Sequence, residues 1–417
     1  MAMAETNTMK MTEIGPIPQE WDALPLSDIG NFSKGAGITR EQANSGNLPC
    51  VRYGEIYTTH DNYIRAFYSH ISPELAKTAT RLKTGDILFA GSGETKEEIG
   101  KAVSFIGEEE AYAGGDIIIL SPKVPASSLY LGFVLNDEAS VRQKSSMGQG
   151  DAVVHIHAKE LANVVVPFPH PTEQKHIAEV LQSIDTLIAE LDKVVSKKRL
   201  MKQGAMQQLL TGKVRVKGFS TPWIEVELRQ TGVMKSGGTP STLVPEYWNG
   251  DINWLQSGAV QNCYIYPSAV SQKITELGLS KSAAYLISHD SVLIALTGAT
   301  CANVGYLTFD SAANQSVVSI EPYPEYSAKF LYQLLLTKRD LILQNRGGSA
   351  QGGVTLNQLK GITVTLPRDL EEQVEIAAIL SAMDNEIAAL EAERDKYKNI
   401  KQGMMQKLLT GQIRLPV

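Results

Sequence analysis

Two segments of the chain carry hydrophobic residues with a period of seven, which predicts two long helices. In the first segment apolar residues stand at 177, 184, 191 and 205, with a parallel row at 181, 188, 195 and 209. The second segment has rows that begin at 376 and at 380. A heptad pattern of this length is typical of helices that pack along a shared apolar seam. The predicted seam consists of Ile177, Leu181, Ile184, Ile188, Leu191, Val195, Ile376, Leu380, Met383, Ile387, Leu390 and Tyr397.

Start and stop signals bound both helices. Pro171 suits a first helical position, and Asp369 stands three residues before Glu372, as in a capping box. Gly212 and Gly411 follow the last apolar residues and suit the left-handed backbone of a helix C-terminus. We therefore expect a first spacer helix within residues 169–213, and a second spacer helix followed by a C-terminal tail within residues 368–417.

The charges along the two helices favour antiparallel packing. Each helix is acidic in its first half and basic in its second half. Antiparallel packing places acid beside base and opposes the helix dipoles, whereas parallel packing aligns like charges. A second interpretation stays open, in which the charges only complement each helix's own dipole on a solvated face. The apolar seam needs a partner in either case.

The helices belong to a tandem repeat. The sequence KQGAMQQLLTGKVR begins at residue 202, and KQGMMQKLLTGQIR begins at residue 401. A fainter repeat precedes each helix: WDALPLSDIG matches WIEVELRQTG, and the strand-length runs GDILFAGSG and IGKAVSF match DSVLIALTG and VGYLTF. We predict an α+β fold with two strand-rich globular domains in pseudo-twofold tandem repeat, separated by two long antiparallel coiled-coil helices. The globular domains are expected at residues 1–168, with residues 1–12 disordered, and at residues 214–367.

Composition narrows the class of protein. The chain has 417 residues, of which 43% are hydrophobic, so it can bury sizeable cores. No stretch reaches the roughly 20 apolar residues of a membrane span, and the N-terminus does not look like a signal peptide, so we expect a cytoplasmic protein. The three cysteines lack metal-type spacing, which predicts neither disulfides nor zinc. The net charge of −6 argues mildly against a protein that coats nucleic acid unaided.

Five short segments resemble the specificity subunits of type I restriction-modification systems. These are IGPIPQEW before the first domain, VPFPHPTEQ and VTLPRDLEEQ before the helices, and LLTGKVR and LLTGQIR at their ends. The first repeat departs slightly, with one residue fewer between its proline and Glu-Gln, and with MGQGDAVVHIHAKEL where the second repeat reads GGSAQGGVTLNQL.

The resemblance implies a recognition subunit without chemistry of its own. Each domain would read one half of a split, asymmetric target on double-stranded DNA. The implied partners are two methyltransferase subunits, which bring S-adenosylmethionine, and restriction or translocase subunits, which bring ATP and Mg²⁺. No cofactor, metal or membrane is expected for this chain itself. A catalytically silent coiled-coil scaffold that does not read DNA stays open as an alternative, and an autonomous nuclease is a more distant one.

Three motifs contain residue types that occur in catalytic or metal sites. GETKEEIGKA lacks the first glycine and the final Ser/Thr of a phosphate-binding loop. Asp86 followed by Glu94 and Lys96 has the residue types of a metal-dependent nuclease, but the last two follow a Gly-Ser-Gly turn, which favours a solvated loop. His155 and His157 could face one side of a strand, but no third metal ligand is near in sequence. We interpret all three as structural.

Reading DNA requires side chains that reach base edges and cations that reach phosphates. Each candidate taken alone is more often a turn or surface residue. In the first domain the candidates are Lys34, Arg40, Arg52, Tyr53, Asn62, Tyr63, Arg65, Arg142, Lys144 and Gln149. In the second domain they are Lys235, Trp248, Asn253, Gln256, Gln261, Asn262, Tyr264, Asn303, Asn314, Gln315, Arg346 and Gln351.

Overall fold

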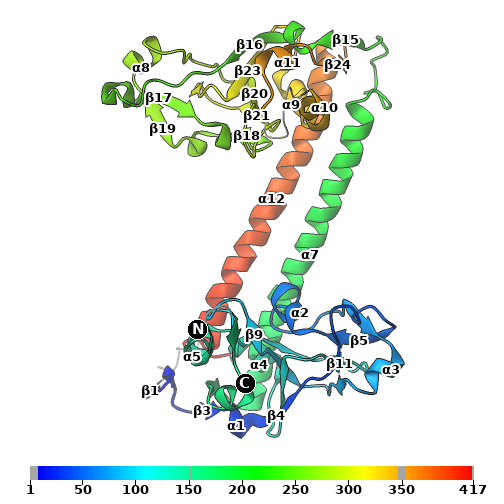
Figure 1. Ribbon diagram of the computed structural model, residues 1–417, viewed down its shortest axis with the longest axis vertical. Coiled ribbons are helices and arrows are strands. Elements are labelled where there is room, and N and C mark those ends of the chain that lie inside the picture. Colours follow the sequence, from blue (N-terminus) through cyan, green and yellow to red (C-terminus); the bar gives the residue numbers. More distant parts are fainter. Residues whose placement is uncertain (1–7, 151–152, 346–352, 416–417) are drawn as a thin grey trace, which may run out of the picture. The chain divides into compact units, whose positions relative to one another are not determined.

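The computed structural model describes residues 8–150, 153–345 and 353–415 (Figure 1). The fold is α+β, and the same arrangement occurs twice along the chain: a strand-rich globular domain is followed by a 39-residue helix. The helices are α7 (Pro171–Leu209) and α12 (Leu370–Leu408). Two compact units form, one from residues 1–191 and 393–417 and the other from residues 192–392. Each long helix therefore contributes residues to both units.

The first globular domain contains two four-stranded sheets. One has the order β10-β8-β12-β4 and is antiparallel throughout, and the other has the order β6-β5-β11-β7 with one parallel pair, β5 and β11. Three two-stranded pairs, β1-β2, β13-β9 and β14-β3, complete it. The strands are β1 (Met9–Thr12), β2 (Gly15–Pro18), β3 (Asp22–Pro25), β4 (Gly30–Lys34), β5 (Leu48–Val51), β6 (Ser69–Ile71), β7 (Thr80–Arg81), β8 (Ile87–Ala90), β9 (Ser92–Gly93), β10 (Ala102–Ser104), β11 (Tyr112–Ala113), β12 (Ile117–Pro122), β13 (Val154–His155) and β14 (Val165–Phe168).

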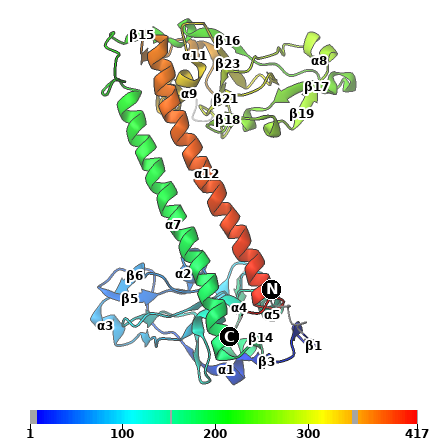
Figure 2. The same cartoon turned by 180° about the vertical axis from the view of Figure 1, so that it is seen from behind.

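Short helices cover these sheets. They are α1 (Leu26–Ile29), α2 (Tyr53–Thr58), α3 (Pro73–Ala76), α4 (Ser128–Val134), α5 (Glu138–Met147) and α6 (Ala158–Leu161). Ser127 caps α4 and Asp137 caps α5, each through a side-chain oxygen that accepts a backbone N–H of the first turn. In both views the last turns of α12 lie beside α5 (Figures 1 and 2).

The second globular domain repeats this plan with a five-stranded sheet of order β16-β23-β20-β21-β18 and a three-stranded sheet of order β19-β17-β22. The pair β15-β24 matches β3-β14 of the first domain. The strands are β15 (Ile224–Glu227), β16 (Gly232–Ser236), β17 (Trp248–Leu255), β18 (Cys263–Ile265), β19 (Gln272–Ile274), β20 (Ser291–Ala295), β21 (Val304–Leu307), β22 (Ala312–Ala313), β23 (Val317–Pro322) and β24 (Thr363–Leu366). The helices are α8 (Glu276–Ser280), α9 (Ala328–Leu336), α10 (Arg339–Gln344) and α11 (Leu356–Lys360), and the 3-10 turns are η1 (Leu228–Gln230), η2 (Pro245–Tyr247), η3 (Ser257–Ala259) and η4 (Pro267–Ala269).

The apolar runs matched between the repeats form strands, as predicted: β8 and β10 in the first domain, and β20 and β21 in the second. All residues of β8 and β20 are buried, because helices or the other sheet cover both faces. α4 packs on the first sheet through Tyr130 and Phe133, and α9 packs on the second through Phe330 and Leu334, all fully buried. The main core of the first domain therefore lies between the sheet that contains β8 and the helix α4, and that of the second lies between the sheet that contains β20 and the helix α9.

Glycine is required where the chain leaves β4 in the first domain and β16 in the second. A Cβ at Gly35 would lie 2.0 Å from the carbonyl oxygen of Gly114. A Cβ at Gly237 would lie 2.2 Å from the carbonyl oxygen of Ala313. The glycine-rich turns KGAG and KSGGTP thus permit the same close backbone approach in both repeats.

Pro171, Gly212 and Gly411 act as predicted at the ends of the long helices, whereas the Glu372 carboxylate accepts from Arg215 and Trp223 and does not close the expected capping box with Asp369. α7 begins at Pro171, and Gly212 and Gly411, which follow α7 and α12, both have φ +69°. Val214 N–H donates to Gln208 O, and Ile413 N–H donates to Lys407 O, so the two C-termini close with the same hydrogen bond.

Inside each unit the two helices run antiparallel, as predicted. In the second unit Lys198 pairs with Glu386 at 2.5 Å, and Arg215 pairs with Glu372 at 2.6 Å. In the first unit Lys401 pairs with Asp185 at 2.6 Å, and Arg414 pairs with Glu173. From one ion pair to the next, the residue number of one partner rises while that of the other partner falls. The two helices are therefore antiparallel.

Several seam residues also complete the globular cores. Ile177 and Leu181 are fully buried in one cluster with Leu408 of α12 and the first domain. Ile376 and Leu380 are fully buried in one cluster with Leu210 and the second domain. Of the remaining members, the well-buried ones are Val195 and Ile387, and the half-buried ones are Ile184, Ile188, Leu191, Met383, Leu390 and Tyr397.

Residues 9–12 depart from the expected disorder. Met9–Thr12 form β1, which pairs with β2 from Met9 opposite Pro18 to Thr12 opposite Gly15. The turn is possible because Gly15 adopts φ +101°, and the Thr12 hydroxyl donates to Gly15 O at 2.7 Å. The rest of that prediction, residues 1–7, lies outside the described residues. Within the described part of the chain, none of the helices is long and apolar enough to cross a membrane.

Candidate nucleic-acid interface

A duplicated carboxylate joins each globular domain to the ends of both helices. Trp21 Nε1 donates to Glu173 Oε2 at 2.9 Å, and Arg414 Nη2 donates to the same oxygen at 2.8 Å. In the second unit Trp223 Nε1 donates to Glu372 Oε2 at 3.3 Å, and Arg215 Nη2 donates to it at 2.7 Å. The hydrogen bond from Arg414 to Glu173 raises the pKa of that guanidinium.

The glutamine after each glutamate binds backbone. Gln174 Oε1 accepts from Ser127 N, and Gln373 Oε1 accepts from Ser327 N, both at 2.9 Å. Their amide nitrogens donate to Pro169 O and Pro367 O. The Glu-Gln pairs of VPFPHPTEQ and VTLPRDLEEQ therefore hold the domains on the helices and are buried away from any DNA.

The second domain presents a group of exposed amides. Gln256 Nε2 donates to Gln272 Oε1 at 3.1 Å, and Asn262 Nδ2 donates to Asn303 Oδ1 at 3.3 Å. Gln261 is also exposed, and its amide donates to Gly258 O. Asn and Gln amides match the donor and acceptor pair on the major-groove edge of adenine. This surface has the chemistry for base reading.

A groove of about 670 Å³ adjoins the pair of Gln256 and Gln272, because Gln272 is one of its lining residues. Trp248, Asn253, Gln272 and Lys273 line it. Asn253 Nδ2 donates to Asp310 O at 3.4 Å, and Trp248 Nε1 donates to Ser241 O at 3.1 Å. Gln272 and Lys273 were missed in the sequence because only the antiparallel pairing of β17 with β19 brings them beside Asn253 and Trp254.

The remaining second-domain candidates lie in several places. Lys235 is exposed, with its Nζ 5.2 Å from the Tyr285 ring centroid. Gln315 is exposed and accepts from the Thr239 hydroxyl, whereas Asn314 is half-buried and caps Ser316 N. Tyr264 is half-buried among other tyrosines. Arg346 and Gln351 lie outside the described residues.

The exposed first-domain candidates are Lys34, Arg40, Tyr53, Arg65, Arg142 and Gln149. Arg142 pairs with Glu138 at 2.6 Å, and Lys34 lies 3.9 Å from Asp116. Both pairs are well exposed, so each cation can exchange its partner for a phosphate at small cost. Arg52 is more constrained, because it pairs with Glu55 at 3.3 Å and donates to Ser69.

Three first-domain candidates need correction. Asn62, Tyr63 and Lys144 are buried, with 7%, 5% and 1% of their surface exposed, and therefore present no surface to a DNA duplex. Asn62 accepts from Asn136 Nδ2 at 3.1 Å, and Tyr63 packs edge-on against Phe133. Arg65 is exposed and stays a candidate, although its Nη2 lies 3.3 Å from Asp185 on α7. Asn62 and Tyr63 lie in a segment that packs against α4, and Lys144 lies on α5 with its amine among backbone carbonyls, which residue type alone does not signal.

Lys144 is held by backbone carbonyls. Its Nζ donates to Leu135 O at 2.6 Å and to Gly100 O at 2.7 Å. Burial disfavours the ammonium form and lowers the pKa of Lys144 to about 7. Its role in the first domain is to satisfy two carbonyls beneath α5.

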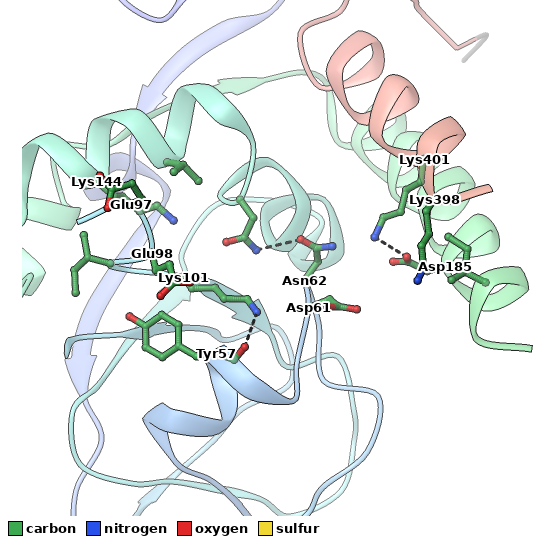
Figure 3. A pocket seen from close by; sticks show the side chains of 14 residues that line it. Tyr57, Asp61, Asn62, Glu97, Glu98, Lys101, Lys144, Asp185, Lys398 and Lys401 are labelled. Carbon is green, nitrogen blue, oxygen red and sulfur yellow. Dashed lines mark hydrogen bonds and ion pairs between the residues drawn. The ribbon is translucent and has the colours of Figure 1, made fainter. Parts of the chain in front are cut away.

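A cavity of about 460 Å³ lies between the first domain and the helices of its unit (Figure 3). Figure 3 shows Asp185 and Lys401 on the helices at one side, and Asn62 and Lys101 on the domain. Lys101 Nζ donates to His60 O at 2.7 Å. The residues that line the cavity carry charges of both signs, so the cavity does not favour an anion such as phosphate.

Asp86 and His155, from two of the motifs with catalytic or metal-site residue types, contact neighbouring residues of the fold. Asp86 is buried and accepts from Lys83 N at 2.8 Å and from the Ser121 hydroxyl at 2.6 Å. His155 Nδ1 lies 2.9 Å from Ser92 Oγ, and His157 precedes α6. Across the described ranges no cluster of three or more His, Cys, Asp or Glu side chains could hold a metal ion.

Known proteins share both the sequence pattern and the fold. The family model described as type I restriction modification DNA specificity domain matches twice, at residues 18–198 and 221–401. The chain is 26% identical over 425 residues to the putative type I restriction enzyme MjaX specificity subunit of Methanocaldococcus jannaschii, covering 97% of this chain and 96% of that protein. It is 25% identical over 182 residues to the EcoKI specificity subunit of Escherichia coli K12, covering 43% of this chain and 38% of that one.

A solved structure agrees in fold. The S subunit of a type I restriction-modification system from M. genitalium superposes with a TM-score of 0.64 at 14% identity, covering 96% of this chain and 98% of that one. Two family matches at repeat spacing, each spanning a globular domain and most of its long helix, account for nearly the whole chain. The chain belongs to the type I restriction-modification DNA specificity family, with two copies of its domain.

Proposed function

We propose that this chain is the DNA-recognition subunit of a type I restriction-modification complex and that it reads a bipartite, asymmetric target with one domain per half-site. The observation that carries the proposal is the presence of two DNA specificity domains whose frameworks match and whose exposed loops differ. The second domain offers neutral amides, whereas the first offers mainly cations and Tyr53. Different loop chemistry on one framework suits two different half-sites.

Partner subunits supply the chemistry in this proposal. Two methyltransferase subunits bring S-adenosylmethionine and much of the phosphate contact, and restriction subunits bring ATP and Mg²⁺. The net charge of −6 supports this division, because phosphate contacts dominate DNA affinity while base contacts discriminate. The exposed cations of the first domain then orient the DNA but do not hold it unaided.

Reconstitution tests the proposal. The purified chain alone should neither methylate nor cleave DNA, and its mixture with the cognate methyltransferase subunits should methylate one bipartite sequence. Methylation sites are mapped by single-molecule sequencing, and binding is measured over a range of salt concentrations. Methylation or cleavage by the chain alone, after removal of contaminants, would contradict it. Assembly without sequence selectivity would favour a scaffold that does not read DNA.

A further inference from the structure

A second duplicated carboxylate lies farther along each long helix. Asp185 and Asp384 occupy the same position in the two repeats. The Asp185 side chain is 4% exposed and accepts Lys401 Nζ at 2.6 Å. Asp384 pairs with Lys202, the counterpart of Lys401. Each carboxylate therefore binds a lysine from the other helix.

Each of these carboxylates also binds its own globular domain. Gln333 Nε2 donates to Asp384 Oδ2 at 2.9 Å. Arg65 Nη2 lies 3.3 Å from Asp185 Oδ2 and forms an ion pair with it, although that oxygen has no hydrogen-bond partner within the described residues. Arg65 belongs to the loop after α2, whereas Gln333 belongs to α9. Three structural elements, two helices and one domain, thus meet at a single carboxylate in both units.

In the second unit the contact continues to the amide-bearing loop. The Tyr264 hydroxyl lies 3.0 Å from Ser381 Oγ on α12, one turn before Asp384. Its ring packs against Tyr306 and Tyr332 at centroid distances of 5.1 and 5.2 Å. The Tyr332 hydroxyl donates to Asn262 O at 3.2 Å. Tyrosine rings therefore join α12 to the exposed loop that carries Asn262.

In the first unit different residues make the equivalent contact. The Arg65 guanidinium lies over the Tyr63 ring at 4.9 Å, and Tyr63 packs edge-on against Phe133 at 6.1 Å. Lys401 Nζ lies 5.6 Å from the Phe133 ring centroid. The surroundings have diverged between the repeats, yet the carboxylate and its lysine are the same. That pattern points to a shared role for the carboxylate itself.

Directional polar contacts can fix the angle between a globular domain and its helix pair, whereas an apolar seam alone cannot. Apolar packing is non-directional, so a heptad seam tolerates small rotations of what it carries. Charge-assisted hydrogen bonds have preferred directions and distances. A buried polar group in a helix interface is also a well-attested means of fixing register.

We propose that Asp185 and Asp384 are positioning residues that fix the orientation of each reading domain on its helix pair and thereby set the permitted spacing of the two half-sites. The inference rests on the proposed function. It assigns Arg65 to positioning and not to DNA contact. The carboxylates affect which spacer is accepted, while the half-site sequences are read by the exposed loops.

The test uses the reconstituted methyltransferase complex and a DNA library with fixed half-sites and varied spacers. Asp384→Asn should leave both half-sites unchanged. It should increase methylation at spacers one base pair too long or too short by about tenfold relative to the native spacer, the size expected for one lost charge-assisted hydrogen bond. Single-molecule methylation sequencing reads half-sites and spacer independently. A loss of stability alone would lower methylation at all spacers equally, and that result would overturn the inference.

A charge exchange provides the rescue. Lys202→Asp combined with Asp384→Lys restores the ion pair in reverse, and the buried Gln333 Oε1, which has no hydrogen-bond partner within the described residues, can accept from the new lysine. This double variant should return the spacer preference to the native value. Glu391→Gln is the control, because it removes an ion pair between the same helices, with Arg199, that includes no residue of the globular domain. A control that relaxes the spacer as much as Asp384→Asn would overturn the inference.

If Asp384→Asn prevents assembly of the methyltransferase complex, the Tyr264→Phe variant tests the positioning role instead. It removes only the hydroxyl that contacts Ser381 and keeps the ring packing. Spacer preference should relax in the same direction, and an unchanged preference in an active complex would overturn the inference. A wild-type complex that methylates without a bipartite target would instead contradict the proposed function, and the positioning role with it. These two failures are distinguished by the wild-type methylation map alone.

Discussion

Arg414, near the end of the chain, donates from Nη2 to Oε2 of Glu173 at 2.8 Å, across 241 residues of sequence. Glu173 is almost fully buried, and the Trp21 indole donates to the same oxygen. The segment after α12 therefore completes the first globular domain. Leu408 and Leu409, fully or almost fully buried in that domain's core, support the same conclusion.

Replacing Arg414 should destabilise the first unit. Arg414→Met removes both hydrogen bonds from Arg414 to the buried Glu173 carboxylate, and a buried ion pair that loses one partner costs about 3 kcal/mol. Chemical denaturation followed by intrinsic tryptophan fluorescence measures the loss. Arg215→Met is the matched variant and should destabilise the second unit through Glu372. Equal stability of Arg414→Met and the wild type would contradict this account.

Lys144 should make stability depend on pH. Burial lowers its pKa in the folded protein to about 7, from an ordinary value of 10.5. Between these two values the unfolded chain holds a proton that the folded chain lacks, so this residue's contribution to stability rises with pH. The slope is at most about 1.4 kcal/mol per pH unit. The contribution is constant below pH 7 and again above pH 10.5.

Lys144→Met removes this titration. Its free energy of unfolding, measured by denaturant titration from pH 6 to 10, should rise less steeply with pH than that of the wild type. The difference between the two slopes isolates Lys144 from the tyrosines and cysteines that titrate in the same range. Parallel profiles would show that the amine stays protonated in the folded protein.

Exchanging the first domain should change one half-site only. A chimera carries the corresponding domain of a relative in place of residues 17–166 and keeps its own helices and second domain. Methylation mapping should show one new half-site, with the other half-site and the spacer retained. Simultaneous change of both half-sites would mean that the two domains do not read independently.

Lengthening both helices should lengthen the spacer. Four residues inserted after Leu191, matched by four after Leu390 to keep the seam, add about 6 Å of helix and about 40° of rotation. At about 3.4 Å per base pair, the preferred spacer should grow by about one or two base pairs. Both half-sites should stay the same. An unchanged spacer in an active complex would show that the helices do not set the distance.

The sequence by itself determined the repeat, the two long helices and the class of fold. Heptad spacing and the Pro171 and Gly212 signals are local, because a helix is set by hydrogen bonds four residues apart and by one apolar face. The matched apolar runs became β8 and β20 for the same reason: a strand covered on both faces needs continuous apolar residues. The five motif segments were sufficient to indicate the family because they are spread across both repeats.

Only the tertiary structure decided which polar residues face solvent. Asn62 and Lys144 have the residue types of DNA contacts, yet both are buried, because their hydrogen-bond partners Asn136, Gly100 and Leu135 lie far enough away in sequence that no local pattern connects them. Lys273 lies opposite Asn253, and Gln272 opposite Trp254, only through the pairing of β19 with β17. The carboxylates of Glu173 and Asp185 looked like ordinary helix charges in sequence. Their burial depends on Arg414 and Lys401, more than 200 residues away, and a contact of that range is set by the packing of the whole unit.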